Sequence, residues 1–447
     1  MRIKVEKMNS RGQGIGRIDG LVTFVDGALP GEEVEAEVVV RKRDYAVAKV
    51  VSVLSPSSER RNPACSHFGS CGGCQLQHAS YDCQLSLKAE LAADALRRIG
   101  GFRSLQIKPC VPSPKSIGYR NKASFPIRRQ GKRGTIGLFR EGSHRVVPIT
   151  SCPAVENLIQ QVFSHFRSLM SEDLLSAYDE RFRLGLLRHL VVRAGSFTGE
   201  ILVALVVAEE PDADEKTKLK AIAEATAHAF PSLRGFVLNV NRSEGNFIWG
   251  GKSRTLVGKD ELTEHLGDFS FIFSAASFFQ VNSYQALNLY RFVASELEGT
   301  GGGRVLELYS GVGSLTAFLA KEAEEVMAVE EDAEAVRHMR GNMARNGLRN
   351  VRTLCGRAED TVHLWRDWAP QTVVLDPPRS GCHPKVVAGL ISARPRKIIY
   401  VSCNAATLAR DAAVLCEQGY AVTCVQPFDM FPQTAHVECV AVFLRNS

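Results

Sequence analysis

Blocks of apolar residues recur at regular intervals in the last third of the chain, from Ser270 onward. Each short run of aliphatic and β-branched residues is followed by a longer stretch whose apolar positions have helical spacing. Strands are expected at 304–309, 325–330, 351–355, 372–376, 397–402, 420–426 and 437–444, and helices at 315–321, 333–346, 358–365, 384–391 and 407–418. Strands that alternate with helices are typical of a parallel sheet covered on both faces. We therefore predict a multidomain α/β protein with a Rossmann-like C-terminal sheet.

The first two thirds of the chain have a different pattern. Short alternating strands at 2–5, 20–25, 33–40 and 45–54, separated by glycine-rich turns, predict a small N-terminal β-barrel of the OB kind. Strands at 122–127, 135–139, 187–194, 201–207 and 235–239, with helices at 83–99, 155–170 and 214–229, predict a central α+β region. We place the domains at 1–55, 56–265 and 266–447, and the helix at 83–99 is a candidate to pack on the third domain.

Hydropathy argues against a membrane protein. The longest apolar run, at 201–208, is too short to span a bilayer, and the N-terminus lacks the apolar core of a signal peptide. We expect a soluble, cytoplasmic protein with no membrane partner. Twelve cysteines in such a chain do not form a disulfide framework, so their thiols are available for metal binding or chemistry.

Basic residues are concentrated in the first third of the chain. Residues 1–150 contain 25 Lys and Arg against 13 Asp and Glu, whereas the remainder contains 30 against 35. Between Arg103 and Arg145 there are 11 basic residues and one acidic residue. A block this one-sided favours a polyanionic partner. The arginines lie close in sequence to Tyr119, Phe125 and Phe139, a combination that suits phosphate contacts with base stacking, so we expect RNA as the partner.

Three cysteines lie close together just after the predicted barrel. Cys65, Cys71 and Cys74 have the spacing C-x5-C-x2-C, with glycines where the chain must wrap around a common centre. The fourth ligand must come from elsewhere, and Cys83, Cys110 and Cys152 are the candidates. Cys152 precedes a proline, as does the isolated cysteine that completes ferredoxin-type ligation. Zinc also accepts four thiolates, and the spacing alone does not choose between zinc and an iron–sulfur cluster.

The first strand–helix turn of the C-terminal sheet has the features of a nucleoside site. Gly311 and Gly313 lie in that turn, and Glu330 ends the next strand, where a carboxylate accepts both hydroxyls of a ribose. Thr316 interrupts the G-x-G-x-x-G pattern that cradles a pyrophosphate. A nucleoside without phosphates, such as S-adenosylmethionine, is therefore favoured over NAD. Asp376 ends a later strand and places a second carboxylate at the same edge of the sheet.

A thiol and a carboxylate are expected at that edge as well. Cys403 follows the strand at 397–402, and an antiparallel last strand would bring His436 and Glu438 beside it. A thiol next to a methyl-donor site suits methylation of a pyrimidine at C5, a carbon too weakly nucleophilic to take a methyl group unaided. Addition of the thiolate to C6 creates an enolate at C5, and after methyl transfer a base removes the C5 proton and the thiol is expelled.

These residues give the chain a specific resemblance. It is similar to the RNA uracil-C5 methyltransferases (TrmA/RumA family), and most of all to the RumA/RlmD-type enzymes of 23S ribosomal RNA. The matching features are the glycine pattern of a TRAM barrel, the four cysteines, Phe278-Phe279-Gln280-Val281-Asn282, the strand and turn at 306–313, Asp376-Pro377-Pro378-Arg379, Ser402-Cys403-Asn404 and His436-Val437-Glu438.

The resemblance implies roles for individual residues. It implies a class I methyltransferase sheet, a [4Fe-4S] cluster held by Cys65, Cys71, Cys74 and Cys152, Cys403 as the nucleophile and Glu438 as the base. The methyl donor, S-adenosylmethionine, would be bound by Gln280, Tyr309, Ser314 and Glu330, with Asp376 at its methionine end or at the uracil. It further implies a monomer that acts on 23S ribosomal RNA before or during ribosome assembly.

Other functions remain open at this point. The same chemistry could act on transfer RNA, or the target could be C5 of cytosine, whose enzymes also use a cysteine but protonate N3 with an acid. Adenine-N6 enzymes require an aromatic residue after Asp-Pro-Pro, and Arg379 is not one. An RNA-binding iron–sulfur protein without activity is a further alternative, against which the conjunction of a thiol, an aspartate and a glutamate argues.

Overall fold

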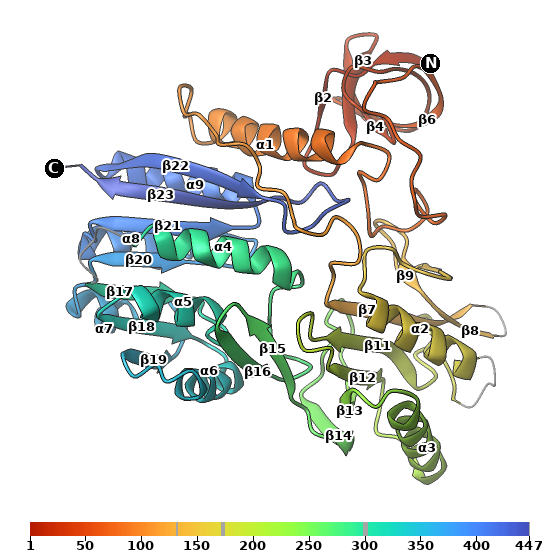
Figure 1. Ribbon diagram of the computed structural model, residues 1–447. Helices are drawn as coiled ribbons and strands as arrows, with labels where there is room; N and C mark the ends of the chain where they lie inside the picture. The colour runs from red at the N-terminus through yellow and green to blue at the C-terminus, as the bar shows by residue number, and fades with distance from the viewer. Residues whose placement is uncertain (131–132, 171–174, 298–302, 447) are drawn as a thin grey trace.

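The computed structural model describes residues 1–130, 133–170, 175–297 and 303–446. Figure 1 shows a small barrel-like sheet at the N-terminus, a long helix, a mixed central sheet and a larger C-terminal sheet flanked by helices. Among the described helices, none combines the length and the apolar character needed to cross a bilayer.

The N-terminal sheet consists of short, strongly curved strands. They are β1 (Arg2–Lys4), β2 (Lys7–Met8), β3 (Gly14–Ile18), β4 (Leu21–Asp26), β5 (Glu33–Arg41) and β6 (Ala46–Ser55), in the order β1-β5-β6-β4-β3-β2. Alternate residues are buried in the first half of β5, and Ile3, Val25 and Val34 fill the interior. Gly16 lets β3 approach β1, because a Cβ atom there would lie 2.5 Å from the carbonyl oxygen of Lys4.

A linker of irregular backbone leads from the barrel to α1 (Tyr81–Arg98), whose N-cap is Ser80. The helix packs against α9 (Ala405–Glu417) and β22 (Tyr420–Phe428). Its buried residues Ala92 and Leu96 belong to the core of the C-terminal domain. The helix expected at 83–99 therefore contacts the C-terminal domain.

The central region is a six-stranded mixed sheet of order β14-β13-β12-β11-β7-β8. Its elements are β7 (Lys122–Gln130), β8 (Arg133–Ile136), α2 (Asn157–Met170), β11 (Leu187–Ala194), β12 (Ile201–Val207), α3 (Ala213–Ala229), β13 (Leu233–Val240) and β14 (Lys252–Gly258). Two hairpins accompany it, β9 (Leu138–Phe139) with β10 (Val146–Val147) and β15 (Leu262–Leu266) with β16 (Phe269–Phe273). Every residue of β11 and β12 is buried, so neither strand shows the alternation of a half-exposed strand.

The C-terminal sheet has seven strands in the order β19-β18-β17-β20-β21-β23-β22. Its strands are β17 (Arg304–Leu308), β18 (Glu325–Glu330), β19 (Val351–Cys355), β20 (Thr372–Leu375), β21 (Lys397–Ser402), β22 and β23 (Glu438–Arg445). The first five run parallel, and β23 is antiparallel to both β21 and β22. This hairpin was expected from the sequence, and it brings the start of β23 to the edge where the parallel strands end.

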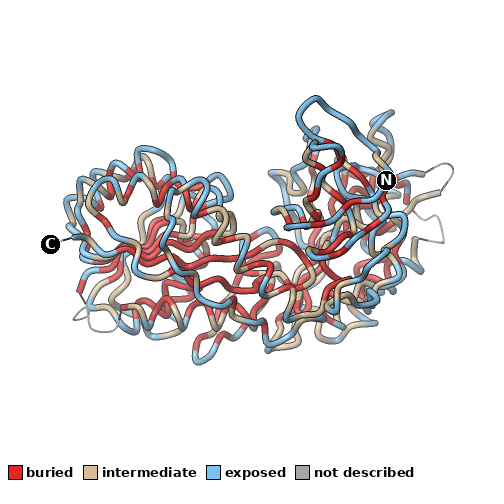
Figure 2. The backbone as a smooth tube through the Cα atoms, turned by 90° about the horizontal axis from the view of Figure 1, so that it is seen from above, coloured by how far each residue is buried: buried red, intermediate tan, exposed pale blue. Residues whose placement is uncertain are grey.

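Helices cover both faces of this sheet. One core cluster joins Val305, Val326 and Val374 to α4 (Ser283–Ser295), α5 (Ser314–Glu322) and α6 (Ala333–Arg345). The opposite cluster joins Leu306 and Val373 to α7 (Val362–Asp367), α8 (Pro384–Ala393) and α9. In Figure 2 the buried positions lie along the strands, and exposed positions lie on the outer helices and loops.

Two helices differ from the expectation. Pattern reasoning did not predict α4, which begins after the N-cap Asn282. The helix expected at 358–365 is α7, which begins later because the Thr361 hydroxyl donates to the carbonyl oxygens of Arg357 and Ala358 and closes a turn there.

Candidate active site

Four chain segments place polar residues along one edge of the C-terminal sheet. Tyr309 follows β17, Glu330 ends β18, Asp376 follows β20 and Cys403 follows β21. Glu438 begins β23, whose next residue pairs with the last residue of β21. Because parallel strands end at the same edge, residues far apart in sequence share a single site.

Cys403 is the only thiol of this group and is half-buried. It lies between the end of β21 and α9, whose N-cap is Asn404. Burial, together with the carboxyl groups of Glu438 and Asp376, raises the pKa of Cys403 to about 11, while Arg379 acts in the opposite direction. The thiol is thus reachable from solvent and carries its proton at rest.

Glu438 and Asp376 form an acidic pair beside the thiol, in which Glu438 is buried and Asp376 is half-buried. The Glu438 side chain is buried, and burial together with the neighbouring Asp376 raises its pKa well above the ordinary value. Burial also raises the pKa of Asp376 to about 7. Of the described residues, Arg379 is the one cation whose charge lowers the pKa of Glu438, so acidic groups outnumber cations here. Such an edge favours a positively charged ligand.

Arg379 is the functional candidate that the sequence analysis did not identify. Its guanidinium lies near the Cys403 side chain and lowers the pKa of that thiol. Its carbonyl oxygen accepts hydrogen bonds from Asn404 Nδ2 at 2.9 Å and Thr407 Oγ1 at 3.4 Å, which tie the loop after β20 to the start of α9. The indication in the sequence was a single basic residue directly after Asp-Pro-Pro. It lies at the edge of the sheet where the parallel strands end, which we call the catalytic edge.

The turn after β17 is shaped for a close ligand. Tyr309 adopts a φ of 66°, which non-glycine residues rarely take and which concentrates at functional sites. Glu330 accepts hydrogen bonds from the backbone N–H groups of Gly311 and Asp332, both at 2.9 Å. These bonds fix the carboxylate at the strand end, and each oxygen retains a lone pair for a ligand hydroxyl.

The remaining predicted cofactor residues have distinct surroundings. Gln280 is buried, and its backbone carbonyl oxygen accepts a 2.9 Å hydrogen bond from Asn121 Nδ2. The Ser314 hydroxyl is 2.9 Å from the hydroxyl of Tyr290, and both side chains are buried. Ser314 therefore already has a partner within the protein, whereas the carboxylate of Glu330 faces the turn.

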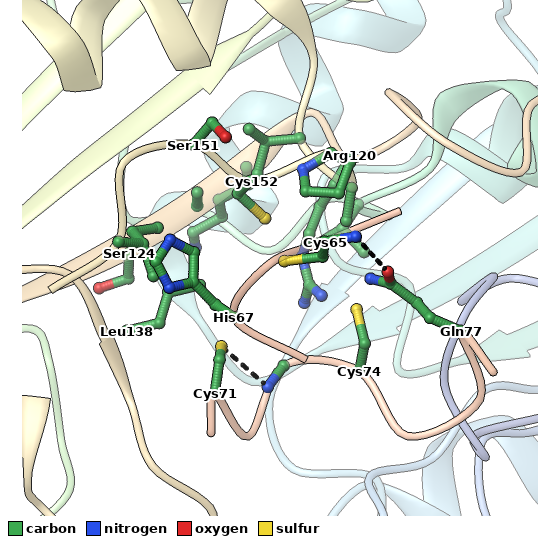
Figure 3. A pocket seen from close by; sticks show the side chains of 18 of the residues that line it. Cys65, His67, Cys71, Cys74, Gln77, Arg120, Ser124, Leu138, Ser151 and Cys152 are labelled. Atoms are coloured by element: carbon green, nitrogen blue, oxygen red, sulfur yellow. Dashed lines mark hydrogen bonds between the residues drawn. The ribbon is translucent and has the colours of Figure 1, made fainter. Parts of the chain in front are cut away.

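The four predicted cysteine ligands line a single cavity of about 400 Å³ (Figure 3). Cys152 belongs to this lining together with Cys65, Cys71 and Cys74. The other candidates for the fourth position lie elsewhere, because Cys83 packs near the barrel and Cys110 lies beside Asp429 and Lys88. Burial and the neighbouring thiols raise the pKa of Cys74 to about 11.

The cavity has the lining of an anion-binding site. Arg120 and Lys122 contribute to its wall, which contains no carboxylate among the described residues. Gly73 N–H donates to Cys71 Sγ at 3.3 Å, a contact that favours a thiolate. Within the described residues, no three cysteine, histidine or carboxylate side chains converge closely enough to ligate one metal ion. The four thiols line a cavity and do not converge on one position.

A second cavity, of about 580 Å³, opens onto Cys403. The barrel contributes Met8, Asn9 and Ser10 to its wall, α1 contributes Asp94 and Arg98, and the catalytic edge contributes Arg379 and His436. The N-terminal domain therefore lies directly across from the thiol.

Comparisons with known proteins agree with this architecture. Residues 80–447 match the tRNA (uracil-5-)-methyltransferase family model, and residues 1–51 match the TRAM domain. An uncharacterized RNA methyltransferase of Synechocystis sp. is 38% identical over 99% of this chain and 95% of its own length, and one of Halalkalibacterium halodurans is 36% identical over 100% and 97%.

A solved structure shows the same arrangement. The tRNA (uracil-54, C5)-methyltransferase of Pyrococcus abyssi, in complex with S-adenosyl-L-homocysteine, has a TM-score of 0.78 and 30% identity, covering 99% of this chain and 100% of that one. Full-length matches of this kind identify both the fold and the reaction class. The chain therefore belongs to the tRNA (uracil-5-)-methyltransferase family and is an S-adenosylmethionine-dependent RNA (uracil-5-)-methyltransferase with an N-terminal TRAM domain.

Proposed function

We propose that the protein methylates C5 of one uridine in 23S ribosomal RNA, giving 5-methyluridine, with Cys403 as the nucleophile and Glu438 as the base. The observation that carries this proposal is the half-exposed thiol of Cys403 with the buried Glu438, the half-buried Asp376 and a guanidinium around it. A thiol and a base at one site are what C5 chemistry requires.

The reaction begins with the thiol of Cys403. It loses its proton to solvent and adds to C6 of the uracil, and the C5–C6 electron pair moves into an enolate. Arg379 assists because a positive charge beside the sulfur lowers the free energy of the thiolate. S-adenosylmethionine, when bound, supplies the methyl group that C5 takes.

Glu438 completes the reaction by accepting the C5 proton. The C5–H electron pair then re-forms the C5–C6 double bond, and the C6–S bond breaks to release Cys403. Glu438 must be ionised for this step, and Arg379 lowers its pKa. A cation held beside Asp376 lowers the pKa further, so donor binding and base activation are linked.

The acidic edge supports the proposed donor site. S-adenosylmethionine carries a sulfonium and an ammonium group, and acids outnumber cations around Asp376 and Glu438. We assign Glu330 to the ribose hydroxyls, Asp376 to the methionine end and Gln280 and Tyr309 to the walls of the site. Ser314 would contribute through its position at the start of α5, since its hydroxyl is engaged by Tyr290.

We further propose that Cys65, Cys71, Cys74 and Cys152 hold a [4Fe-4S] cluster. Four thiols around one cavity of about 400 Å³ leave room for a cluster, and zinc is the alternative. The cation Arg120 supports it too, because four thiolates around a cluster leave a net negative charge. Iron, sulfide and zinc analysis of anaerobically purified protein tests this assignment.

Transfer RNA is the second candidate substrate. The Pyrococcus abyssi relative acts on transfer RNA and is 30% identical over the full length. The test is to incubate unmodified 23S and transfer RNA separately with labelled donor and to map 5-methyluridine. Methylation of 23S RNA alone supports the proposal, and methylation of transfer RNA alone overturns it.

The chemical roles are tested by trapping. Glu438→Gln should still add Cys403 to C6 and transfer the methyl group, but it should leave the RNA covalently bound, as a band that survives denaturing electrophoresis. The double variant Cys403→Ala/Glu438→Gln should show no such band. Release of methylated RNA by Glu438→Gln at the wild-type rate would contradict the base assignment.

A further inference from the structure

A third cavity, of about 490 Å³, lies on the central domain between the end of β13 and the start of β14. Its wall includes Arg242, Phe247, Trp249 and Lys252. None of these residues has a role in the chemistry of the catalytic edge. We call these four residues and the space between them the 242–252 groove.

Buried amide side chains hold this loop in one shape. Asn241 Nδ2 donates to the carbonyl oxygens of Phe247 and Ile248, at 2.6 and 2.9 Å. Asn239 donates to the carbonyl oxygen of Gly250 at 3.0 Å and accepts its N–H at 2.8 Å. A loop preorganised in this way loses little entropy when it binds a ligand.

The braced loop presents an aromatic ring to solvent. The Phe247 side chain is 78% exposed, although its carbonyl oxygen is held by the fully buried Asn241. The nearby Trp249 is half-buried, and Lys122 Nζ lies 5.9 Å from the centroid of its ring. Two aromatic rings on a rigid loop form a platform on which bases can stack.

The groove also carries unpaired positive charge. Among the described residues, neither Arg242 nor Lys252 makes an ion pair, and both are exposed. The one carboxylate in the wall, Glu210, is paired with Arg254. A surface with free cations beside exposed aromatic rings complements a phosphate backbone with unstacked bases.

The groove is connected to the catalytic region through β7. Lys122, which contacts Trp249, also lines the cysteine cavity. The preceding residue, Asn121, donates to the carbonyl oxygen of Gln280 and to Ser283 Oγ, at 2.9 and 2.8 Å. The residues at the start of β7 therefore contact both the groove and the segment that contains Gln280.

We propose that the 242–252 groove binds a single-stranded segment of the substrate RNA that flanks the target uridine. Bases stack on Phe247 and Trp249, and phosphates contact Arg242 and Lys252. The inference rests on RNA being the substrate, which the family establishes, and not on the choice between ribosomal and transfer RNA. It adds a binding site outside the catalytic edge and the TRAM domain.

Fluorescein-labelled oligouridylates of two lengths, about 5 and about 20 nucleotides, test the proposal. An OB-type site covers about 4–16 nucleotides, so only the long oligomer can occupy such a site and the groove together. Phe247→Ala should weaken binding of the long oligomer about tenfold, the effect of losing one stacked base, and change binding of the short one less than about twofold. Arg242→Ala/Lys252→Ala should lower the slope of log Kd against log salt by about 1.4, since each single-strand phosphate contact contributes about 0.7.

Matched controls remove exposed side chains from the C-terminal domain. Leu364→Ala and Arg349→Ala should bind both oligomers as the wild type does. Phe247 is mostly exposed, so its removal leaves no cavity, and circular dichroism with a melting curve verifies folding. Wild-type affinity of Phe247→Ala for the long oligomer would overturn the proposal and would assign the groove to a partner other than RNA.

A crosslinking experiment places the RNA directly. Long oligomers with one 5-iodouridine at successive positions are irradiated with the wild-type protein, and peptides are identified by mass spectrometry. A crosslink to Phe247 or Trp249 from an iodouridine several nucleotides away from the one that crosslinks near Cys403 supports the inference. Crosslinks confined to the catalytic edge and the barrel would contradict it. If no covalent adduct forms on Cys403 but the groove still binds RNA, the proposed chemistry fails and the proposal for the groove stands.

Discussion

The catalytic edge and the cysteine cavity both surround thiols, with different charged neighbours. At the edge, burial and two acids raise the pKa of Cys403, and Arg379 offsets them in part. In the cavity, four thiols face Arg120 and Lys122, with no carboxylate in the described wall. In the first environment one thiol carries its proton at rest. In the second, burial and the neighbouring thiols also raise the pKa of Cys71, Cys74 and Cys152, so these thiols would lose their protons only as a metal binds. The same side chain thus serves different roles because of its neighbours.

The two regions share a support, the segment from Asp429 to Ala435 that precedes Glu438. The Gln433 carbonyl oxygen accepts the N–H groups of Gln75 and Leu76, the residues after Cys74, at 3.0 and 2.9 Å. On the other side, α1 holds the segment through Lys88, which pairs with the fully buried Asp429. The cysteine loop and Glu438 are therefore braced against the same stretch of chain.

The largest expected difference separates two cysteine substitutions. Cys403→Ala should lower turnover at least ~10⁴-fold, because it removes the nucleophile, and should leave the melting temperature unchanged. Cys74→Ala should lower iron content and melting temperature while Cys403 still reacts with iodoacetamide. Activity assays, metal analysis and calorimetry on both variants check this. A Cys74→Ala protein with full iron content, or an active Cys403→Ala protein, would break the comparison.

The next largest effect tests the shared support. Lys88→Met leaves Asp429 buried without its charge partner, which should lower the free energy of unfolding by about 3–5 kcal/mol. Urea denaturation measures this cost. The double variant Lys88→Met/Asp429→Leu should recover most of it, because an apolar pair often replaces a buried ion pair at little cost. A loss below about 1 kcal/mol in the single variant would show that the pair does not hold the segment.

The two regions also differ in how much of each could be predicted from the sequence. The strand ends at the catalytic edge followed from periodicity, because a buried parallel strand is a continuous apolar run that stops where the polar residue appears. The helix α4 did not follow, since its buried face includes Ser283 and Gln285. These bond to Glu264 and to the carbonyl oxygen of Val111, at 2.7 and 2.8 Å. When buried polar residues form hydrogen bonds with distant elements, the sequence shows no apolar periodicity from which their helix could be predicted.

The cysteine cavity depended even more on tertiary structure. Cysteine spacing left Cys83, Cys110 and Cys152 open as the fourth ligand, and the resemblance named Cys152, which the fold brings to the wall of the cavity. Arg379 was overlooked for a similar reason. Its contact with the Cys403 side chain joins the loop after β20 to the start of α9, a proximity that no spacing along the chain encodes.

Removing the guanidinium at the catalytic edge should have an intermediate effect. Arg379 lowers the pKa of Cys403 from a value already raised to about 11, so Arg379→Met should raise it further. If the rise is about one unit, the thiolate fraction and the alkylation rate at pH 8 fall about tenfold. The rate should keep increasing with pH beyond the point where the wild type levels off. Arg410→Met is the control, because Arg410 pairs with Asp411 instead. An unchanged alkylation profile for Arg379→Met would remove Arg379 from the activation of the thiol.

The smallest expected effect concerns the hydrogen bonds between α1 and the segment that precedes Glu438. Gln84 Oε1 accepts the Gln433 N–H, and its Nε2 donates to Gln433 Oε1, both at 3.0 Å. Gln84→Met keeps the volume and removes these bonds, a change of about 1 kcal/mol, or about fivefold in rate if it is felt at the base. Rapid-quench measurements should then show that the covalent adduct forms at the normal rate and decays about fivefold more slowly. Leu96→Met, a buried substitution on the same helix away from the segment, should change neither rate. Equal slowing of formation and decay in Gln84→Met would mean that α1 supports the fold as a whole rather than the position of the base.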